Sequence, residues 1–313
     1  MGVAQIGEGT QSQHGGSRVL VLGGAGFIGR HAVAALVAAG AEVIVGSRHP
    51  LRIDHRLPPS AASCARREVR FEEHTDAEHW HALIADVDVV LNCVGILRQR
   101  GRATYQRVHL LAPTALAAAC QSQRKRLVHV SALGLNAPAR SRFLTSKLAG
   151  EQAIRASGGD WVIARPSLLD GRGGYGAWWL RAVSRLPIFA VPADAQGRVA
   201  ALDVSELGEA LAKLCVGSAE ALQLGASREF DLGGPQPLSL TQYILALRRT
   251  HTSRPAFCVR VPGLLARAVA HVCDLLHATP FSFGHWELLR RDNVPVHNRL
   301  PELLGRTPRQ VGL

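Results

Sequence analysis

Hydrophobic residues in the first half of the chain form short continuous runs that alternate with stretches of helical spacing. Six runs predict buried strands, namely 18–22, 42–45, 69–71, 87–92, 126–131 and 161–164. Four stretches predict the helices between them, namely 27–39, 77–85, 104–122 and 141–156. The proline-containing residues 49–67 predict a loop. Strands that are apolar on both faces and separated by helices predict a parallel sheet with helices on either side.

After Pro166 this alternation ends, and the pattern predicts a smaller part of the molecule. Glycines gather at 171–176, and helical spacing recurs in later segments, namely 177–185, 207–216, 240–249, 264–276 and 280–292. We interpret this half as a smaller C-terminal α/β cap that leans on the carboxyl edge of the sheet. The expected organisation is a flexible tail at 1–16, a main domain at 17–165 and the smaller substrate- or partner-binding part at 166–313.

Three spaced glycines, Gly23, Gly26 and Gly29, stand directly after the first predicted strand and open the first predicted helix. Gly23 would permit a tight turn, Gly26 would let the backbone approach a pyrophosphate, and Gly29 would let the helix pack against the strand. The N-terminus of that helix offers free N–H groups and a partial positive charge to an anion. The sequence therefore predicts a Rossmann-type, doubly wound α/β fold in which residues 17–165 form a dinucleotide-binding domain.

The residues that follow the second strand distinguish the two nicotinamide dinucleotides. An acidic side chain at this place binds the 2′-hydroxyl of the adenosine ribose. This chain has Ser47 and Arg48 instead. Because a guanidinium attracts a 2′-phosphate and a serine hydroxyl can donate to it, we expect NADP(H) to be preferred over NAD(H). The alternative is that Arg48 is an ordinary surface arginine.

These residues, together with Asn92 to Gly95 after the fourth strand and Ser131 after the fifth, resemble an extended or atypical short-chain dehydrogenase/reductase. The resemblance covers about residues 17–310. It is sharpest in three segments, namely 94–97 with 105–113, 127–134, and 286–293. These segments are similar to the branch that contains the NADPH-binding accessory subunit of respiratory complex I and its bacterial relatives. Such relatives are described as NAD-dependent epimerase/dehydratase-like proteins.

The resemblance implies a catalytic Ser, Tyr and Lys, of which this chain keeps two. Ser131 and Lys147 stand at the Ser and Lys positions, but Phe143 replaces the Tyr of the Tyr-x-x-x-Lys motif. In the family the Tyr hydroxyl exchanges a proton with the substrate oxygen, and the Lys lowers the pKa of that Tyr and binds the nicotinamide ribose. A phenyl ring can neither donate nor accept that proton. Among the remaining tyrosines, Tyr175 is the best candidate for a substitute acid or base.

The resemblance also implies which residues contact the dinucleotide. They come from the phosphate loop, from the ends of the second and fourth strands, and from the segments that follow the third and sixth strands. The expected contact residues are Gly23, Gly26, Phe27, Ile28, Gly29, Ser47, Arg48, His74, Asn92, Cys93, Val94, Gly95, Lys147 and Pro166.

The net charge of +12 comes almost wholly from arginine, since lysine occurs only at Lys125, Lys147 and Lys213. Such a surface favours anionic partners, although an arginine-rich composition without function is an equal alternative. One cluster at the carboxyl edge could receive an anionic substrate or a lipid headgroup, namely Arg98, Arg100, Arg102 and Arg107. Aromatic residues make up only 5% of the chain and hardly interleave with the arginines, which argues against nucleic acid.

Several classes of protein are excluded or disfavoured by the sequence. No apolar stretch reaches the ~20 residues of a membrane helix, and the N-terminus lacks the basic start and apolar segment of a secretory signal. Six scattered cysteines without a CxxC pair predict reduced thiols, and His79 and His81 do not share a helical face, so no metal site is expected. We expect a cytoplasmic protein or one peripheral to the inner membrane. For the apolar stripe at 264–276, core packing is the default, and docking to a membrane or partner subunit is the alternative.

Two main hypotheses follow for the function. The first is an NADP(H)-binding protein that is weakly active or non-catalytic and supports a quinone-linked respiratory complex. The second is an active NADP-dependent oxidoreductase, epimerase or dehydratase that uses another acid or base on an unidentified small molecule. A third hypothesis is an RNA- or lipid-surface-binding module on the same fold.

Overall fold

The computed structural model describes residues 16–135, 139–276, 279 and 281–311. The tail predicted at 1–16 lies almost wholly outside these residues. A seven-stranded parallel sheet forms the centre of the molecule, with the strand order β11-β6-β5-β4-β1-β2-β3. The strands are β1 (Arg18–Leu22), β2 (Glu42–Ser47), β3 (Ala65–Glu68), β4 (Val89–Asn92), β5 (Arg126–Val130), β6 (Trp161–Pro166) and β11 (Glu229–Leu232).

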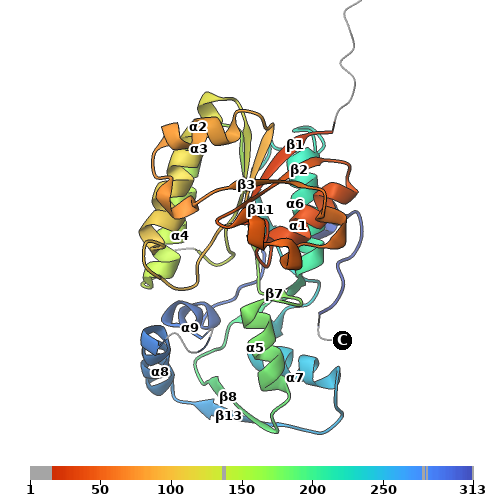
Figure 1. Ribbon diagram of the computed structural model, residues 1–313. Helices are drawn as coiled ribbons and strands as arrows, with labels where there is room; N and C mark the ends of the chain where they lie inside the picture. Colours follow the sequence, from red (N-terminus) through yellow and green to blue (C-terminus); the bar gives the residue numbers. More distant parts are fainter. Residues whose placement is uncertain (1–15, 136–138, 277–278, 280, 312–313) are drawn as a thin grey trace, which may run out of the picture.

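Helices cover both faces of this sheet (Figure 1). One face packs on α1 (Gly29–Ala38), α6 (Val204–Val216) and α10 (Leu300–Leu304). The other packs on α2 (Ala77–Ile84) and α3 (Ala112–Ser122), with α4 (Arg142–Ala156) beside α3. Within β1 the side chains alternate, because Val19 and Val21 join the first core and Leu20 and Leu22 the second. The doubly wound fold predicted from the apolar runs is therefore confirmed.

The third strand lies four residues earlier than predicted, inside the segment 49–67 that was expected to be a loop. It is an edge strand that pairs only with β2, so its residues, Ala65-Arg-Arg-Glu68, need no apolar pattern. Val69 and Phe71 do bury their side chains, but they do so in the core beside α2, and Phe71–Glu73 is a 3-10 turn. Three further 3-10 turns occupy the rest of that segment.

The seventh strand, β11, comes from the second half of the chain and was not predicted. It pairs with β6, and both α6 and α10 pack on the main sheet, so residues well beyond 165 complete the central layers. The strand has only four residues, Glu229-Phe-Asp-Leu232, and two of them are acidic, so the sequence shows no continuous apolar run here. Its apolar residues, Phe230 and Leu232, are fully buried in the core, whereas its acidic residues face an ion-pair network described below.

The remaining elements form the smaller part below the sheet in Figure 1. They are α5 (Tyr175–Ser184), α7 (Leu240–Arg249), α8 (Gly263–Leu276), α9 (Phe283–Leu289) and the parallel pair β8 (Ile188–Pro192) and β13 (Phe257–Val261). Two short ladders join this part to the sheet edge, β7 (Leu169–Asp170) with β10 (Leu202–Asp203) and β9 (Arg198–Val199) with β12 (Leu238–Ser239). The helix predicted at 280–292 is confined to α9.

Candidate dinucleotide and catalytic site

The three glycines form a tight turn between β1 and α1. Gly23 has a φ of +71°, a conformation that favours glycine, and its carbonyl accepts a hydrogen bond of 2.8 Å from the N–H of Gly26. A Cβ built on Gly29 would lie 2.2 Å from the oxygen of Gly23, which leaves no room for a side chain. The turn therefore brings the N-terminus of α1 close to the sheet, and the geometry fits the cradle of a dinucleotide diphosphate.

The glycine cluster after β7 packs on this phosphate loop. The guanidinium of Arg30 donates to the carbonyl of Arg172. A Cβ built on Gly174 would lie 2.6 Å from the ring of Phe27. Phe27, expected to contact the dinucleotide, therefore also joins the loop to the smaller part of the molecule. Sequence reasoning missed this role, because the contact spans about half the chain.

The loop after β4 lies directly beside the phosphate loop. The buried Asn92 holds its shape, because Asn92 Oδ1 accepts from the N–H of Val94 at 3.0 Å. A Cβ built on Gly23 would lie 3.2 Å from Val94 Cγ2, so the two loops touch. Burial raises the pKa of the Cys93 thiol to about 12, and the thiol stays protonated at neutral pH.

A buried histidine supports Asn92 from the neighbouring strand. Asn92 Nδ2 lies 3.0 Å from His129 Nδ1 on β5. Since the amide nitrogen only donates, the imidazole nitrogen accepts. Burial, together with the charge of Lys147, lowers the pKa of His129 to about 3, which keeps the ring neutral. The loop after β4, which is expected to contact the dinucleotide, is thus fixed by an uncharged pair.

Ser131 and Lys147 lie at the carboxyl edge of the sheet with their polar atoms unengaged. Ser131 Oγ is buried and meets the geometry of a hydrogen bond with no described residue, although it lies near enough to the Glu151 carboxylate to help lower its pKa. Lys147 Nζ likewise forms no ion pair or hydrogen bond within the described part of the chain. A Cβ built on Gly95 would lie 3.9 Å from this nitrogen. A buried hydroxyl and an ammonium that both lack a close hydrogen bond, beside a glycine without a side chain, fit the ribose and the substrate oxygen of a bound dinucleotide complex.

Phe143 occupies the position of the missing tyrosine and is buried in a cluster of rings. It stacks on His285 at 5.9 Å and meets Tyr105 and His109 edge to face at 5.9 and 5.7 Å. Lys147 Nζ lies 6.0 Å from the centre of its ring. Burial lowers the pKa of His109 to about 2 and that of His285 to about 4, so both rings are neutral. The hydroxyl of Tyr105 donates to the carbonyl of Leu97 at 2.8 Å.

Burial lowers the pKa of Lys147 from 10.5 to about 8. Below pH 8 the lysine is charged in both states, so its desolvation destabilises the fold. Between about pH 8 and 10.5 only the unfolded chain holds the proton, and this cost falls as the pH rises. We expect Lys147→Met to raise the melting temperature by a few degrees at pH 7, about 1 kcal/mol, and the gain to shrink above pH 8. Thermal unfolding across this pH range measures it.

The matched control for that measurement is Lys213→Met, because Lys213 is exposed on α6. We expect its melting temperature to follow that of the parent protein at every pH. A gain for Lys147→Met that stays constant between pH 7 and 10 would contradict the depressed pKa.

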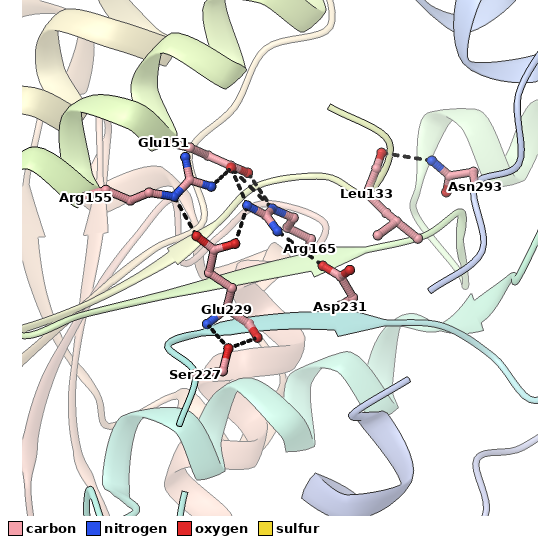
Figure 2. Close-up of polar contacts among 8 residues, drawn as sticks. All are labelled: Leu133, Glu151, Arg155, Arg165, Ser227, Glu229, Asp231 and Asn293. Atoms are coloured by element: carbon pink, nitrogen blue, oxygen red, sulfur yellow. Dashed lines mark hydrogen bonds and ion pairs between the residues drawn. The ribbon is translucent and has the colours of Figure 1, made fainter. Parts of the chain in front are cut away.

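An ion-pair network that sequence reasoning missed joins α4 to the strands β6 and β11 (Figure 2). The carboxylate of Glu151, fully buried on α4, accepts two hydrogen bonds from Arg165, at 3.0 Å from Nε and 2.7 Å from Nη2. Arg165 also pairs with Glu229 and Asp231 on β11, and Arg155 bridges Glu151 and Glu229. Burial alone would raise the pKa of Glu151, but the arginines, with a smaller contribution from Ser131, hold it below its usual value.

This network fixes α4 against the sheet at the residue one turn after Lys147. Arg165 and Glu151 are therefore structural partners that position the helix that carries Lys147. The sequence offered one signal, the spacing of four residues between Lys147 and Glu151, which places both on one side of the helix.

The segment 286–293 ties the C-terminal part to the site. The carboxylate of Glu287 accepts from the backbone N–H groups of Arg140 and Ser141, at 2.7 and 2.9 Å, directly before α4. Asn293 Nδ2 donates to the carbonyl of Leu133 at 2.8 Å, as Figure 2 shows. Ser167 Oγ donates to Asn293 Oδ1 at 2.7 Å. This segment therefore positions the loops after β5 and β6 and the start of the helix that carries Lys147.

The residues expected at the adenosine end lie after β2 and β3. Ser47 Oγ accepts from the N–H of His49 at 3.1 Å. Arg48 is largely exposed and lies 3.8 Å from Glu72, a loose ion pair that leaves its guanidinium available to an anion. His74 packs edge to face on Trp80 at 5.2 Å, and its carbonyl accepts from the Trp80 indole.

Three of the four arginines in the cluster after β4, which was expected to receive an anion, are engaged by protein groups, while Arg100 is exposed. Arg98 donates to the carbonyls of Thr279 and Phe281 and pairs with Asp274 at 3.4 Å. Arg107 Nε donates to the carbonyl of Glu72 at 2.7 Å, and Arg102 pairs with Glu73. Carbonyls and carboxylates from distant segments accept from these three arginines, and the sequence alone does not predict such contacts.

Two further expectations concern Tyr175 and metal ions. Tyr175 begins α5, is about half exposed, and stacks on Trp178 at 6.4 Å. Its helix follows the glycine cluster that packs on Phe27, so Tyr175 lies on the phosphate-loop side of the site.

Among the described residues, no group of His, Cys, Asp or Glu side chains could hold a metal ion. No helix in the same residues is both long and apolar enough to cross a bilayer.

Comparison with known proteins agrees with this geometry. Residues 23–177 match a family described as NAD(P)H-binding. A ceramide reductase of Caulobacter vibrioides is 28% identical over 202 residues, which are 63% of this chain and 60% of that protein. The mitochondrial NADH dehydrogenase (ubiquinone) 1 alpha subcomplex subunit 9 of Arabidopsis thaliana is 27% identical over 171 residues, 54% of this chain and 42% of that protein. The chain thus spans less than two thirds of these relatives.

Solved structures share the fold. A UDP-galactose 4-epimerase superposes with a TM-score of 0.62 at 19% identity over 94% of both chains. The NADPH-dependent quinone oxidoreductase of Escherichia coli, in complex with NADPH, superposes with a TM-score of 0.69 at 13% identity over 94% of this chain and 97% of that one. The predicted Rossmann-type fold and the resemblance to epimerase-like reductases with relatives in complex I are confirmed.

Proposed function

We propose that this chain, whose residues 23–177 match a family described as NAD(P)H-binding, binds NADP(H) with little or no turnover. Gly23, Gly26 and Gly29 would hold the diphosphate, and Lys147 would hold the nicotinamide ribose. When bound, the nicotinamide would supply the hydride chemistry of the family. The bound dinucleotide would stabilise the fold and serve as a sensed ligand.

One observation carries the weak-turnover part of this proposal. Neither Ser131 nor Lys147 forms a close hydrogen bond or ion pair with a described residue, and the ring at the position of the family's tyrosine is Phe143, which bears no hydroxyl. Three other titratable rings contact Phe143. His109 and His285 are neutral at physiological pH and hold no proton to donate there as imidazolium. The hydroxyl of Tyr105 already donates to the carbonyl of Leu97, and burial raises its pKa above the usual value. The site can therefore bind and orient a dinucleotide more readily than it can protonate a substrate oxygen.

The direct test is native mass spectrometry or tryptophan-quench titration with NADPH and NADH side by side. We expect saturable binding of one NADPH per chain and weaker binding of NADH. Absence of binding of either dinucleotide by the folded protein would refute the proposal. Equal affinity for both would refute only the preference for NADP(H).

The preference rests on Arg48, and Arg48→Ala tests it. Loss of a charge-assisted contact to the 2′-phosphate should weaken NADPH binding roughly tenfold, about 1.5 kcal/mol, and leave NADH binding unchanged. Calorimetric titration with each dinucleotide measures the two affinities. Arg249→Ala, at an exposed arginine on α7, is the control for net charge and should leave both affinities unchanged.

A second candidate is a working NADP-dependent reductase or epimerase. The name of the Caulobacter relative, ceramide reductase, supports this alternative, with a lipid carbonyl as its substrate class. The plant relative supports instead a partner role beside a quinone-linked respiratory complex at the inner membrane. Turnover by the unaltered chain distinguishes the two, and the Phe143 variant described in the Discussion is designed for that comparison.

A further inference from the structure

The outer face of α8 is apolar and exposed. Leu264 is 83% and Leu275 78% exposed, values that are extreme for leucines of a folded helix. The same face carries further exposed apolar residues, namely Leu265, Val269, Val272 and Leu276. Only Ala266 and Ala270 are buried on the side that meets α9. The buried side of the helix is therefore made of small residues, and its large aliphatic residues are exposed, while Arg267 and His271 lie on the ring of Phe283 at the flank.

The strand that precedes α8 continues this apolar surface. Phe257 is 74% exposed on β13, and its partner Ile188 on β8 is 58% exposed. The alternate residues of this pair of strands, Cys258 and Phe189, face the core. In Figure 1, α8, β8 and β13 lie together at the end of the molecule away from the main sheet. Exposed apolar residues gathered on neighbouring elements in this way indicate an interaction site.

The charges around this surface are positive. Within residues 254–276 the exposed charged side chains are arginines, namely Arg254, Arg260 and Arg267, of which Arg267 places its guanidinium carbon 5.8 Å from the centre of the Phe283 ring. The one carboxylate, Asp274, turns inward, where it pairs with Arg98 and accepts from the N–H of Phe283. A second copy of this chain, with a net charge of +12, would bring like charges together on this face. An anionic bilayer would accept both the leucines and the arginines.

We infer that α8 and the exposed edge of β13 dock on the surface of an anionic lipid bilayer. The 14-residue α8 is too short to span a membrane, so it would lie in the plane of the interface. Its leucines would enter the boundary between headgroups and acyl chains, while Arg260 and Arg267 would reach the lipid phosphates. This inference uses no part of the dinucleotide site.

Vesicle flotation tests the inference with the full chain. The vesicles contain roughly one phosphatidylglycerol in three lipids, or phosphatidylcholine alone. We expect binding to the anionic vesicles, and binding at least about tenfold weaker to the neutral ones. Leu264→Gln with Leu275→Gln should weaken anionic binding by about tenfold or more, since two buried side chains are lost from the interface. Arg260→Gln with Arg267→Gln should remove most of the preference for anionic lipid.

Leu51→Gln is the matched control, because Leu51 is equally exposed but lies in a 3-10 turn after β2. It should bind vesicles as the parent chain does. Binding that is unaffected by the α8 variants would overturn the inference. So would a chain that ignores both vesicles and instead forms dimers that the α8 variants dissociate, or one that binds only an acidic protein. NADPH titration of the same variants should be unchanged, which separates this result from the fate of the proposed function.

Discussion

Gly29→Ala is expected to abolish dinucleotide binding and to destabilise the fold. The added Cβ would lie 2.2 Å from the oxygen of Gly23 and 2.7 Å from Cα of Gly24, and backbone atoms cannot move aside as a side chain can. The forced separation of α1 from β1 should cost about 2–3 kcal/mol in stability. It should weaken NADPH binding roughly 100-fold or more, because the N–H groups of the helix would no longer converge on the diphosphate. Denaturant unfolding and NADPH titration measure the two effects.

Gly26→Ala separates binding from folding in the same loop. Its Cβ would meet a single atom, the oxygen of Gly23, at 3.0 Å, so we expect a smaller loss of stability with most of the loss of binding. Gly176→Ala is the matched control, since nothing lies within 4 Å of its Cβ. A Gly29→Ala protein that binds NADPH normally would show that the diphosphate lies elsewhere.

Phe143→Tyr is expected to create carbonyl reductase activity where the parent chain has little. The new hydroxyl would lie on the helix face that carries Lys147, one turn away, and would supply the missing proton to a substrate oxygen. General acid catalysis contributes about 10²–10⁴-fold, and we expect a gain in the lower part of that range, since the surrounding rings were packed around phenylalanine. The loss of NADPH absorbance with phenanthrenequinone and with a panel of aldehydes measures the rate.

Two outcomes decide how Phe143 is interpreted. The double change Phe143→Tyr with Lys147→Met should lose the gain, because the tyrosine then lacks the ammonium that favours its ionised form. If the unaltered chain already reduces a substrate as fast as the tyrosine variant, the protein is an enzyme with another acid, and the weak-turnover proposal fails. Melting temperatures of all variants establish that each rate belongs to a folded protein.

The phosphate loop and the sheet behind it are predictable from local sequence. A short continuous apolar run predicts a parallel strand that is buried on both faces. Gly23 and Gly29 stand where the first strand turns sharply into the first helix. The positions of Ser131 and Lys147 follow from the family resemblance. Ser131 comes directly after β5 and Lys147 lies on α4, so both are expected at the carboxyl edge of the sheet. The absence of a hydroxyl at Phe143 is likewise a property of the sequence alone.

Contacts between distant segments escaped prediction. The edge strand β3 and the strand β11 carry charged residues, so their apolar pattern is weak, and they are strands because β2 and β6 offer them unpaired hydrogen-bonding edges. From the sequence, Arg98 was expected to receive an anion, but in the folded chain it donates to the carbonyls of residues 279 and 281. No local sequence pattern predicts hydrogen-bond partners that lie so far away in the chain.

The sequence by itself determined the parallel sheet, the glycine turn and the loss of the tyrosine hydroxyl, since each depends on residue types at short spacing. Only the tertiary structure decided that Glu287 holds the start of α4, that Glu151 and Arg165 fix the same helix from behind, and that the stripe on α8 faces outward. Periodicity states that one face of a helix is apolar. What that face meets depends on elements far away in the chain, whose packing here leaves the leucines of α8 exposed.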